Sequence, residues 1–366
     1  MSPTSEELRA EKPKKEAAEV ERIRGALAAW LSDRLDGAAV EIGDIRSPGE
    51  SGFSSETMIV DASWSVAGAT ERATYVVRCR PTGETVFPDY DMPMQRSCMN
   101  AARAHGVPSP NAPWYESDAG VLGQPFLVME AVDGRVPPDS PPYTIHGFLL
   151  EADADQKREA YFSTIEAMAR LHAIDPDEND LGFLDRGRYG APGIEQEIGY
   201  YTHYLDWVLQ GRSHALLQTA LERLMASVPE PSSRVFSWGD ARFGNTMFAE
   251  DGFSPVSLLD WEMASFAPRE QDLGWFLFFP VFFSDAVELP RLPDVPSDEE
   301  CIAHYEQCAG VELQDLTWWI HWASLRHGAI ITRLADIREK AGEHMDGFTF
   351  EDNFATRILA RYLDLA

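Results

Sequence analysis

A predicted β-hairpin between two polar segments constrains the fold of this chain more than any other feature. The apolar runs Thr246–Phe248 and 256–259 indicate two buried strands, and the turn signal Glu250-Asp251-Gly252 lies between them. Asn245 directly precedes the first run, and Asp260 directly follows the second. Because the strands of a hairpin are antiparallel, these two side chains are expected to lie close together near its open end.

Asp240 adds a second carboxylate upstream of this hairpin, five residues before Asn245. Phosphoryl transfer from ATP needs an Asp that orients and deprotonates a hydroxyl group. It also needs an Asn and a second Asp that hold the magnesium ion on the phosphates. The spacing therefore predicts Asp240 as the base, with Asn245 and Asp260 as metal ligands. Either segment alone is also an ordinary turn sequence; their order, with a hairpin between them, favours the functional interpretation.

The residues Gly239-Asp240, Asn245 and Leu259-Asp260-Trp261-Glu262 resemble the catalytic loop and metal-binding motif of the aminoglycoside phosphotransferase family. That loop usually reads His-Gly-Asp-x-x-x-x-Asn, and Ser237-Trp238 stands here where a His commonly precedes the Gly. The resemblance implies an α+β, protein-kinase-like fold with a small antiparallel-sheet lobe and a larger, mainly helical lobe. It also implies ATP and Mg²⁺ as cofactors and a hydroxyl group of a small molecule as the acceptor.

We expect three parts along the chain: a mobile tail over residues 1–16, an N-terminal ATP-binding lobe over 17–130, and a C-terminal helical lobe over 131–366. The tail is charged and lacks apolar periodicity. From Ala17 to Leu35, apolar residues recur at helical spacing, which predicts an amphipathic helix. Strands are then expected over residues 40–45, 57–62 and 73–80.

The expected nucleotide site lies in the N-terminal lobe. A loop rich in Gly and Ser joins the first two strands, where backbone N–H groups and hydroxyls would cover the phosphates. Arg78 stands where the family usually has a phosphate-binding Lys, and Arg80, on the same strand face, is the alternative. Each of these features has a competing interpretation. The loop could be an ordinary turn, Arg78 could be a solvated strand arginine, and the hinge segment could be the end of a buried central strand. The resemblance implies these nucleotide-binding residues: Ser51, Gly52, Phe53, Ser54, Ser55, Arg78, and the hinge Met129, Glu130, Ala131 and Val132.

Gln95 is the clearest departure from the kinase pattern. It lies on a helix predicted over residues 91–102, where the family helix supplies a Glu that pairs with the strand Lys. A Gln forms no ion pair, so either it hydrogen-bonds the Arg or the basic residue is fixed differently. A catalytically degraded, pseudokinase-like ATP-binding protein is therefore the alternative function. A protein kinase is disfavoured because the His-Arg-Asp and Asp-Phe-Gly triplets are missing.

Further residues near the motifs have structural alternatives. Arg242 either reaches the transferring phosphate as part of the catalytic site or braces the loop by a salt bridge. Asp272 resembles the family Asp that braces the following helix, and His172 is interpreted as a structural histidine on a predicted helix. The aromatic runs 275–283 and 318–322 are expected in the core. Any of them that line the acceptor site would favour a more apolar alcohol over an aminoglycoside.

Composition excludes several partner classes. The net charge of −29 argues against nucleic acid as a partner; the acidity either attracts a cationic substrate or keeps the protein soluble. No apolar run approaches the roughly 20 residues that cross a bilayer, and no signal-peptide segment is visible, so we expect a cytoplasmic protein without a membrane partner. The four cysteines are expected to be reduced. None of the nine histidines forms a His-x-x-x-His pair or joins a cysteine cluster, so no intrinsic zinc site is expected.

Overall fold

The chain divides into two compact units. The computed structural model describes residues 5–48, 56–230 and 234–365, with side chains from Ala17 onward. The smaller unit comprises Met1–Gly83 and Pro110–Val132, and the larger unit comprises Glu84–Ser109 and Asp133–Ala366. A small antiparallel sheet in one unit and a mainly helical second unit confirm the expected α+β fold class.

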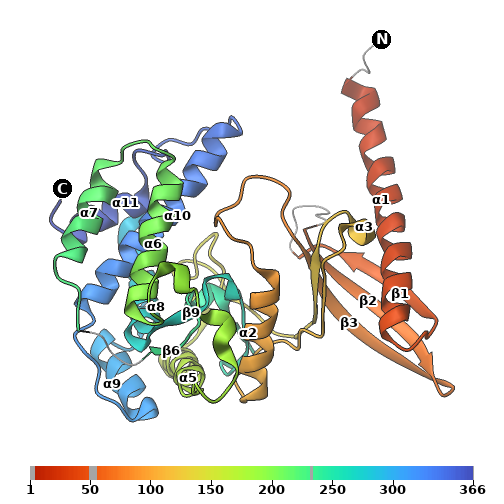
Figure 1. Ribbon diagram of the computed structural model, residues 1–366, viewed down its shortest axis with the longest axis horizontal. Coiled ribbons are helices and arrows are strands. Elements are labelled where there is room, and N and C mark those ends of the chain that lie inside the picture. The colour runs from red at the N-terminus through yellow and green to blue at the C-terminus, as the bar shows by residue number, and fades with distance from the viewer. Residues whose placement is uncertain (1–4, 49–55, 231–233, 366) are drawn as a thin grey trace. The chain divides into compact units, whose positions relative to one another are not determined.

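The smaller unit is built on a five-stranded antiparallel sheet with strand order β1-β2-β3-β5-β4. Helix α1 (Ser5–Arg34) runs along one face of this sheet (Figure 1). The other elements are β1 (Val40–Arg46), β2 (Thr57–Val66), β3 (Ala69–Cys79), β4 (Trp114–Glu116), α3 (Ala119–Leu122) and β5 (Phe126–Glu130).

Alternation along the strands gives this sheet two different faces. The face against α1 is a buried apolar core, formed by Ile23, Leu27, Trp30, Met58, Val60, Tyr75, Val77, Phe126 and Val128. The intervening residues point to the opposite face. There Arg78 is opposite Thr57 and Leu127, and Val76 is opposite Met129. Arg78 and Met129, two of the expected nucleotide-binding residues, therefore share the sheet face that α1 does not cover.

Helix α1 begins at Ser5, which corrects the expected helix start at Ala17 and includes most of the segment expected to be a mobile tail. Glu and Lys, which have high helix propensity, make up most of residues 5–16. Propensity thus extends the helix well before the residues that it buries against the sheet, the first of which is Ile23.

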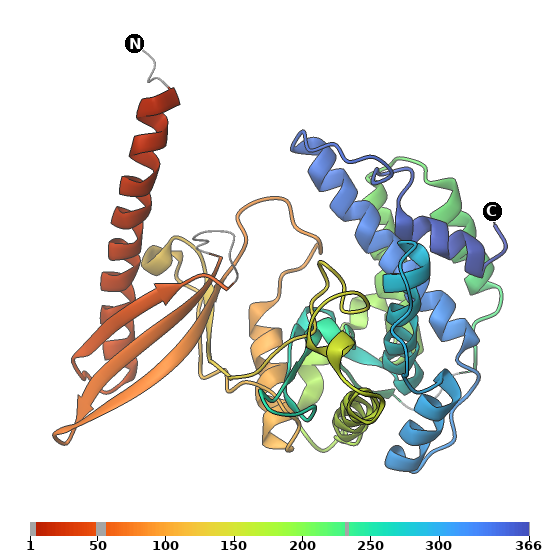
Figure 2. The same cartoon turned by 180° about the vertical axis from the view of Figure 1, so that it is seen from behind.

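The larger unit is mainly helical, with two short two-stranded sheets. Helix α10 packs against α6, α7, α8 and α11 (Figures 1 and 2). The aromatic runs expected in the core are buried there, including Trp275 and Trp322. No helix in the described part of the chain has both the length and the apolar character to cross a bilayer. The sheets pair β6 (Arg234–Ser237) with β9 (Ser265–Pro268) and β7 (Thr246–Phe248) with β8 (Pro255–Leu258).

The helices of the larger unit are α2 (Met92–Ala104), α4 (Phe148–Glu151), α5 (Ala154–His172), α6 (Ile194–Leu209), α7 (Ala215–Met225), α8 (Arg269–Val281), α9 (Asp298–Ala309), α10 (Thr317–Lys340) and α11 (Phe354–Tyr362). Short 3-10 turns are η1 (Leu181–Leu184), η2 (Gly187–Tyr189), η3 (Phe243–Asn245) and η4 (Trp261–Met263), and η5 (Phe282–Ala286) is a π turn.

Residues 84–109, which we expected in the N-terminal lobe, belong to the larger unit. Tyr204 donates a hydrogen bond to the carbonyl of Val86, and the N–H of Leu258 donates to the carbonyl of Pro108, both at 2.9 Å. Helix α2 packs against η1 and η4, and it buries Gln95. Gln95 therefore lies in the unit that carries Asp260, whereas Arg78 lies in the other.

Candidate active site

The predicted hairpin is present, and it brings Asn245 and Asp260 together. Strands β7 and β8 pair antiparallel, with Thr246 opposite Leu258. One residue further, the N–H of Leu259 donates a 2.8 Å hydrogen bond to the carbonyl of Asn245. Asp260 follows directly, so the Asn and the Asp lie side by side at the open end of the hairpin.

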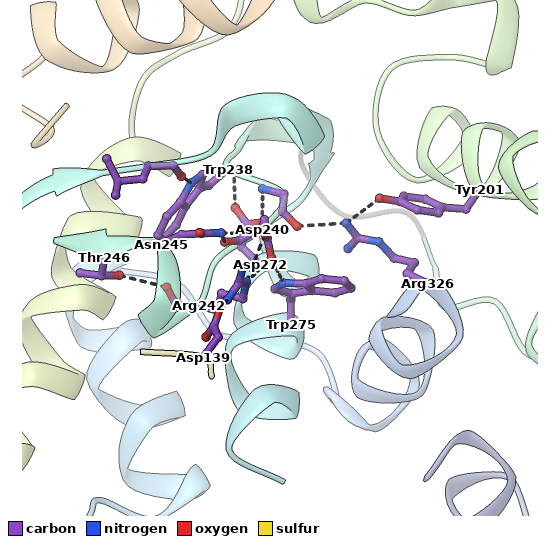
Figure 3. Close-up of polar contacts among 12 residues, drawn as sticks. Asp139, Tyr201, Trp238, Asp240, Arg242, Asn245, Thr246, Asp272, Trp275 and Arg326 are labelled. Atoms are coloured by element: carbon purple, nitrogen blue, oxygen red, sulfur yellow. Dashed lines mark hydrogen bonds and ion pairs between the residues drawn. The ribbon is translucent and has the colours of Figure 1, made fainter. Parts of the chain in front are cut away.

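Three donors surround the carboxylate of Asp240 (Figure 3). The side-chain amide of Asn245 donates to Oδ2 at 2.6 Å, and the indole Nε1 of Trp275 donates to Oδ1 at 2.7 Å. Arg242 Nε donates to Oδ1 at 3.1 Å. Only 8% of Asp240 is exposed. The loop and α8 thus hold this carboxylate in one orientation beside the expected metal ligands.

Arg242 forms the salt bridge that we had considered for it, and it does so with two carboxylates. One is Asp240, and the other is Asp139, an aspartate more than a hundred residues earlier in the chain. Burial lowers the pKa of Arg242, but the two carboxylates outweigh it and raise that pKa above the ordinary arginine value. Arg242 therefore stays charged and braces the loop. Its contact with a transferring phosphate stays a prediction.

Asp272 braces the backbone of the loop through hydrogen bonds, which fits the structural role expected from its position after the metal motif. Its side chain is fully buried and accepts hydrogen bonds from Ser237 Oγ at 2.8 Å, from the N–H of Trp238 at 2.6 Å and from the N–H of Gly239 at 2.8 Å. His172 Nε2 lies 2.9 Å from the same carboxylate. Burial alone would raise the pKa of Asp272, but the bonds from His172 and the loop hold it below its usual value.

His172 is a structural histidine, as interpreted from the sequence. Its ring is buried, with Nε2 facing Asp272 and Nδ1 2.6 Å from the hydroxyl of Tyr305 on α9. Both ring nitrogens are therefore engaged within the larger unit.

Two further buried residues fix the loop, one on each side. Trp238 donates from Nε1 to the carbonyl of Leu259 at 2.7 Å. Arg326, on α10, donates at 3.0 Å both to the carbonyl of Gly239 and to the hydroxyl of Tyr201 (Figure 3). Gly239 has φ of 87°, which favours glycine, and a Cβ at this position would overlap the carbonyl of Met263.

Asn245 and Asp260 form a donor set that fits magnesium. The amide nitrogen of Asn245 bonds to Asp240, which leaves the amide oxygen as the ligand atom. Asp260 contributes a carboxylate, and Mg²⁺ prefers oxygen ligands of this kind. Asp260 also has φ of 57°, an uncommon backbone conformation for a residue other than glycine and one that clusters at functional sites.

The expected phosphate-binding residues are only partly described. Ser51, Gly52, Phe53, Ser54 and Ser55 lie outside the described residues. Arg78 is half-buried on β3, while Arg80 is exposed just beyond the end of that strand. This placement favours Arg78 over Arg80 as the strand arginine on the uncovered sheet face.

The expected hinge follows β5. Within it, the N–H of Glu130 donates to the carbonyl of Asn111 at 2.8 Å, and the N–H of Ala131 donates to the carbonyl of Thr74 at 2.9 Å. These two N–H groups are therefore engaged within the smaller unit. If the hinge contacts an adenine edge, it must do so through other backbone groups of residues 129–132.

Three residues around the loop were missed from the sequence: Trp275, Arg326 and Asp139. Trp275 had a signal, because it lies three residues after Asp272 and so shares a helix face with it. Arg326 had a weaker one, as a charged residue within the otherwise apolar stretch of α10. Asp139 had none, since only the folded chain brings it to Arg242.

The fold and this site together define a phosphotransferase of the protein-kinase-like class. The model of the phosphotransferase enzyme family matches residues 49–295, which is more than half of the chain. The chain therefore belongs to this phosphotransferase enzyme family, which includes the aminoglycoside phosphotransferases it resembles.

Solved structures of this class resemble the chain at low sequence identity. A protein of Ralstonia eutropha JMP134, named provisionally as an aminoglycoside phosphotransferase, is 19% identical with a TM-score of 0.65, over 93% of this chain and 96% of its own. Plasmodium vivax ethanolamine kinase is 14% identical with a TM-score of 0.51, over 89% of this chain and 82% of its own. At these identities, the likeness establishes the fold.

Curated relatives are named as acyl-CoA dehydrogenase family members and not as phosphotransferases. Acyl-CoA dehydrogenase family member 11 of Homo sapiens is 26% identical over 245 residues, which cover 65% of this chain and 30% of that protein. The chain thus spans about a third of the length of this relative.

Proposed function

We propose that this protein is an ATP- and magnesium-dependent kinase that transfers the γ-phosphoryl group to a hydroxyl of a small molecule. The observation that carries the proposal is the hydrogen bond from Asn245 to Asp240, together with the backbone bond that sets Asp260 beside Asn245. A base and two metal ligands are thereby gathered in one small region. An aminoglycoside phosphotransferase of the same fold, whose structure holds ADP and hygromycin B, supports ATP as the donor.

In the proposed reaction, Asp240 orients the acceptor hydroxyl and accepts its proton. The acceptor oxygen forms a bond to the γ-phosphorus as the bond to the β,γ-bridging oxygen breaks, and ADP leaves. Magnesium held by Asn245 and Asp260 would neutralise the phosphate charge. Positioning and charge neutralisation supply most of the acceleration in such reactions, and a general base adds about 10²-fold to 10⁴-fold.

Aromatic side chains around Asp240 favour a more apolar acceptor over a polycationic aminoglycoside. Trp275 donates to Asp240, and its ring lies 5.2 Å from that of Phe279. The guanidinium of Arg242, beside Asp240, lies over the same Phe279 ring at 5.4 Å. The carboxylate to which an acceptor would bring its hydroxyl is therefore set among apolar rings, and Arg242 beside it is already paired with Asp139 and Asp240.

The test is an assay of ADP release against a panel of alcohols. The panel contains aminoglycosides, a macrolide and ethanolamine, and also hydroxylated acyl compounds because curated relatives are named for acyl-CoA chemistry. We expect stimulation by at least one acceptor, with loss of turnover in Asp240→Asn and unchanged nucleotide binding. Asp260→Ala is expected to weaken magnesium-dependent nucleotide binding. Asp251→Asn, exposed in the turn of the same hairpin, is the control.

Unchanged turnover in Asp240→Asn would refute the role of this residue. If the protein binds ATP but no member of the panel stimulates ADP release, the pseudokinase-like alternative would be favoured. The residue that motivates this alternative is the buried Gln95.

A further inference from the structure

A cluster of three potential metal ligands lies on α5 and α9, two helices of the larger unit that run side by side (Figures 1 and 2). Glu166 comes from α5, and His304 and Cys308 come from α9. One ligand atom of each lies within 4.8 Å of the other two. None of the three residues belongs to the loop or the hairpin of the proposed active site.

Two of the three distances in this cluster match the edges of a tetrahedral zinc site. His304 Nε2 lies 3.1 Å from Glu166 Oε1 and 3.6 Å from Cys308 Sγ. Tetrahedral zinc, with bonds of about 2.0–2.1 Å to nitrogen and oxygen and about 2.3 Å to sulfur, separates nitrogen from oxygen by about 3.3 Å and nitrogen from sulfur by about 3.6 Å. A cation at the centre of the cluster would therefore require only small side-chain movements.

The sequence places these ligands by helical spacing on both helices. His304 and Cys308 are four residues apart and so share one face of α9. On α5, Phe162 precedes Glu166 by one turn, and its ring stacks on the His304 imidazole with centroids 4.0 Å apart and an angle of 9°. This stacking fixes the plane of the imidazole.

The two helices are also held together next to the cluster. Arg158 of α5 and Glu300 of α9 form a 2.8 Å ion pair. Each helix begins with a capping box, at Asp153 and at Ser297, so its start is well defined. The position of Glu166 relative to His304 and Cys308 is therefore set before any cation arrives.

We propose that Glu166, His304 and Cys308 bind a divalent cation of the zinc type, with water in the fourth position. A thiolate ligand selects zinc-like cations over magnesium. On binding, the Cys308 thiol releases its proton to solvent. The cation would join α9 to α5 through bonds that replace the present hydrogen bond between His304 and Glu166. Because sequence reasoning looked for His-x-x-x-His pairs and clustered cysteines, it overlooked the pair His304-x-x-x-Cys308.

The experiment titrates chelator-treated, full-length protein with Zn²⁺ and, separately, with Co²⁺. For the wild type, we expect saturable Co²⁺ binding with a thiolate charge-transfer absorption, and a Tm that rises with Zn²⁺ concentration. Cys308→Ser and His304→Ala should each weaken Zn²⁺ binding at least about tenfold. Gln307→Ser, on the exposed side of the same helix turn, should bind as the wild type does.

Cys308→His separates coordination from general stability. It keeps three ligands, so it should retain Zn²⁺ binding and lose only the thiolate absorption of bound Co²⁺. Far-UV circular dichroism checks that each variant is folded. The proposal would be overturned if Cys308→Ser and His304→Ala both bound Zn²⁺ with the affinity of the wild type. It would also be overturned if the wild type gave no saturable Co²⁺ signal.

Discussion

The indole Nε1 of Trp238 donates a 2.7 Å hydrogen bond to the carbonyl oxygen of Leu259, the residue directly before Asp260. This bond ties the loop that carries Asp240 to the strand end that carries the expected metal ligand. Trp238 stands where the related family commonly has a bracing His. The departure from the family motif therefore preserves a brace at this position.

Trp238→Phe should lower the free energy of unfolding by about 2 kcal/mol, because it leaves the partly buried carbonyl of Leu259 without its donor. It should also raise the Mg²⁺ concentration needed for half-maximal nucleotide binding, since Asp260 loses its tie to the loop. The matched control is Trp318→Phe, which removes a similar indole bond to the carbonyl of Leu224 on other helices. Both variants should lose stability in urea unfolding. A Mg²⁺ shift of equal size in both would contradict the assigned role of Trp238.

Gly239→Ala should destabilise the protein by about 2 kcal/mol or more and reduce nucleotide binding. The backbone at Gly239 has a positive φ, and the added methyl group would meet the carbonyl of Met263. Gly252→Ala is the control, because nothing lies within 4 Å of a Cβ there and its φ is ordinary. Thermal unfolding of the two variants measures the difference. Equal melting temperatures would show that the loop adapts to a side chain.

Asp272→Asn should cost about 3 kcal/mol at pH 7, because an amide group would replace a carboxylate oxygen that faces buried N–H donors. The folded pKa of Asp272 lies below the ordinary Asp value of about 4. Its ionised form thus contributes stability that is present above about pH 4 and is lost as the pH falls through the folded pKa. Urea unfolding should therefore show a difference between variant and wild type that shrinks toward pH 2. Asp251→Asn should show no such pH-dependent difference.

His327→Leu should make the protein less sensitive to mild acid. His327 is buried among the rings of Trp275, Phe279 and Phe282, and its Nε2 has no hydrogen-bond partner among the described residues. Burial lowers the pKa of His327 to about 3, with repulsion from the cations Arg242 and Arg326 adding to the effect.

Because this folded pKa lies below the unfolded value of about 6.5, the unfolded chain binds the proton first, and wild-type stability falls as the pH drops from about 6.5 toward 3. The slope from this one group is at most about 1.4 kcal/mol per pH unit. Urea unfolding between pH 7 and pH 4 should show a flatter profile for His327→Leu. The exposed His344→Gln should keep the wild-type profile. Parallel profiles for all three proteins would show that His327 does not titrate as described.

The sequence predicts those parts of the site that depend on local spacing. The hairpin that joins Asn245 to Asp260 was predictable, since strand alternation and a turn signal lie within fifteen residues. The contact of Asp139 with Arg242 was not, because nothing short of the tertiary fold relates two residues a hundred positions apart. Residues 84–109 were assigned to the N-terminal lobe by their order along the chain, whereas their grouping with the larger unit depends on hydrogen bonds to distant residues of that unit, such as Tyr204 and Leu258.

The bonds that Asp272 accepts all come from the protein itself, three from the loop and one from His172. They do not depend on nucleotide, metal or acceptor. A loop ordered in this way has already lost its conformational entropy during folding, so little remains to be lost when substrates bind. In this protein, the rigidity of the loop therefore depends on the same hydrogen bonds that stabilise the fold. A mutation that weakens the hydrogen bonds of Asp272 would appear in assays as poorer substrate affinity.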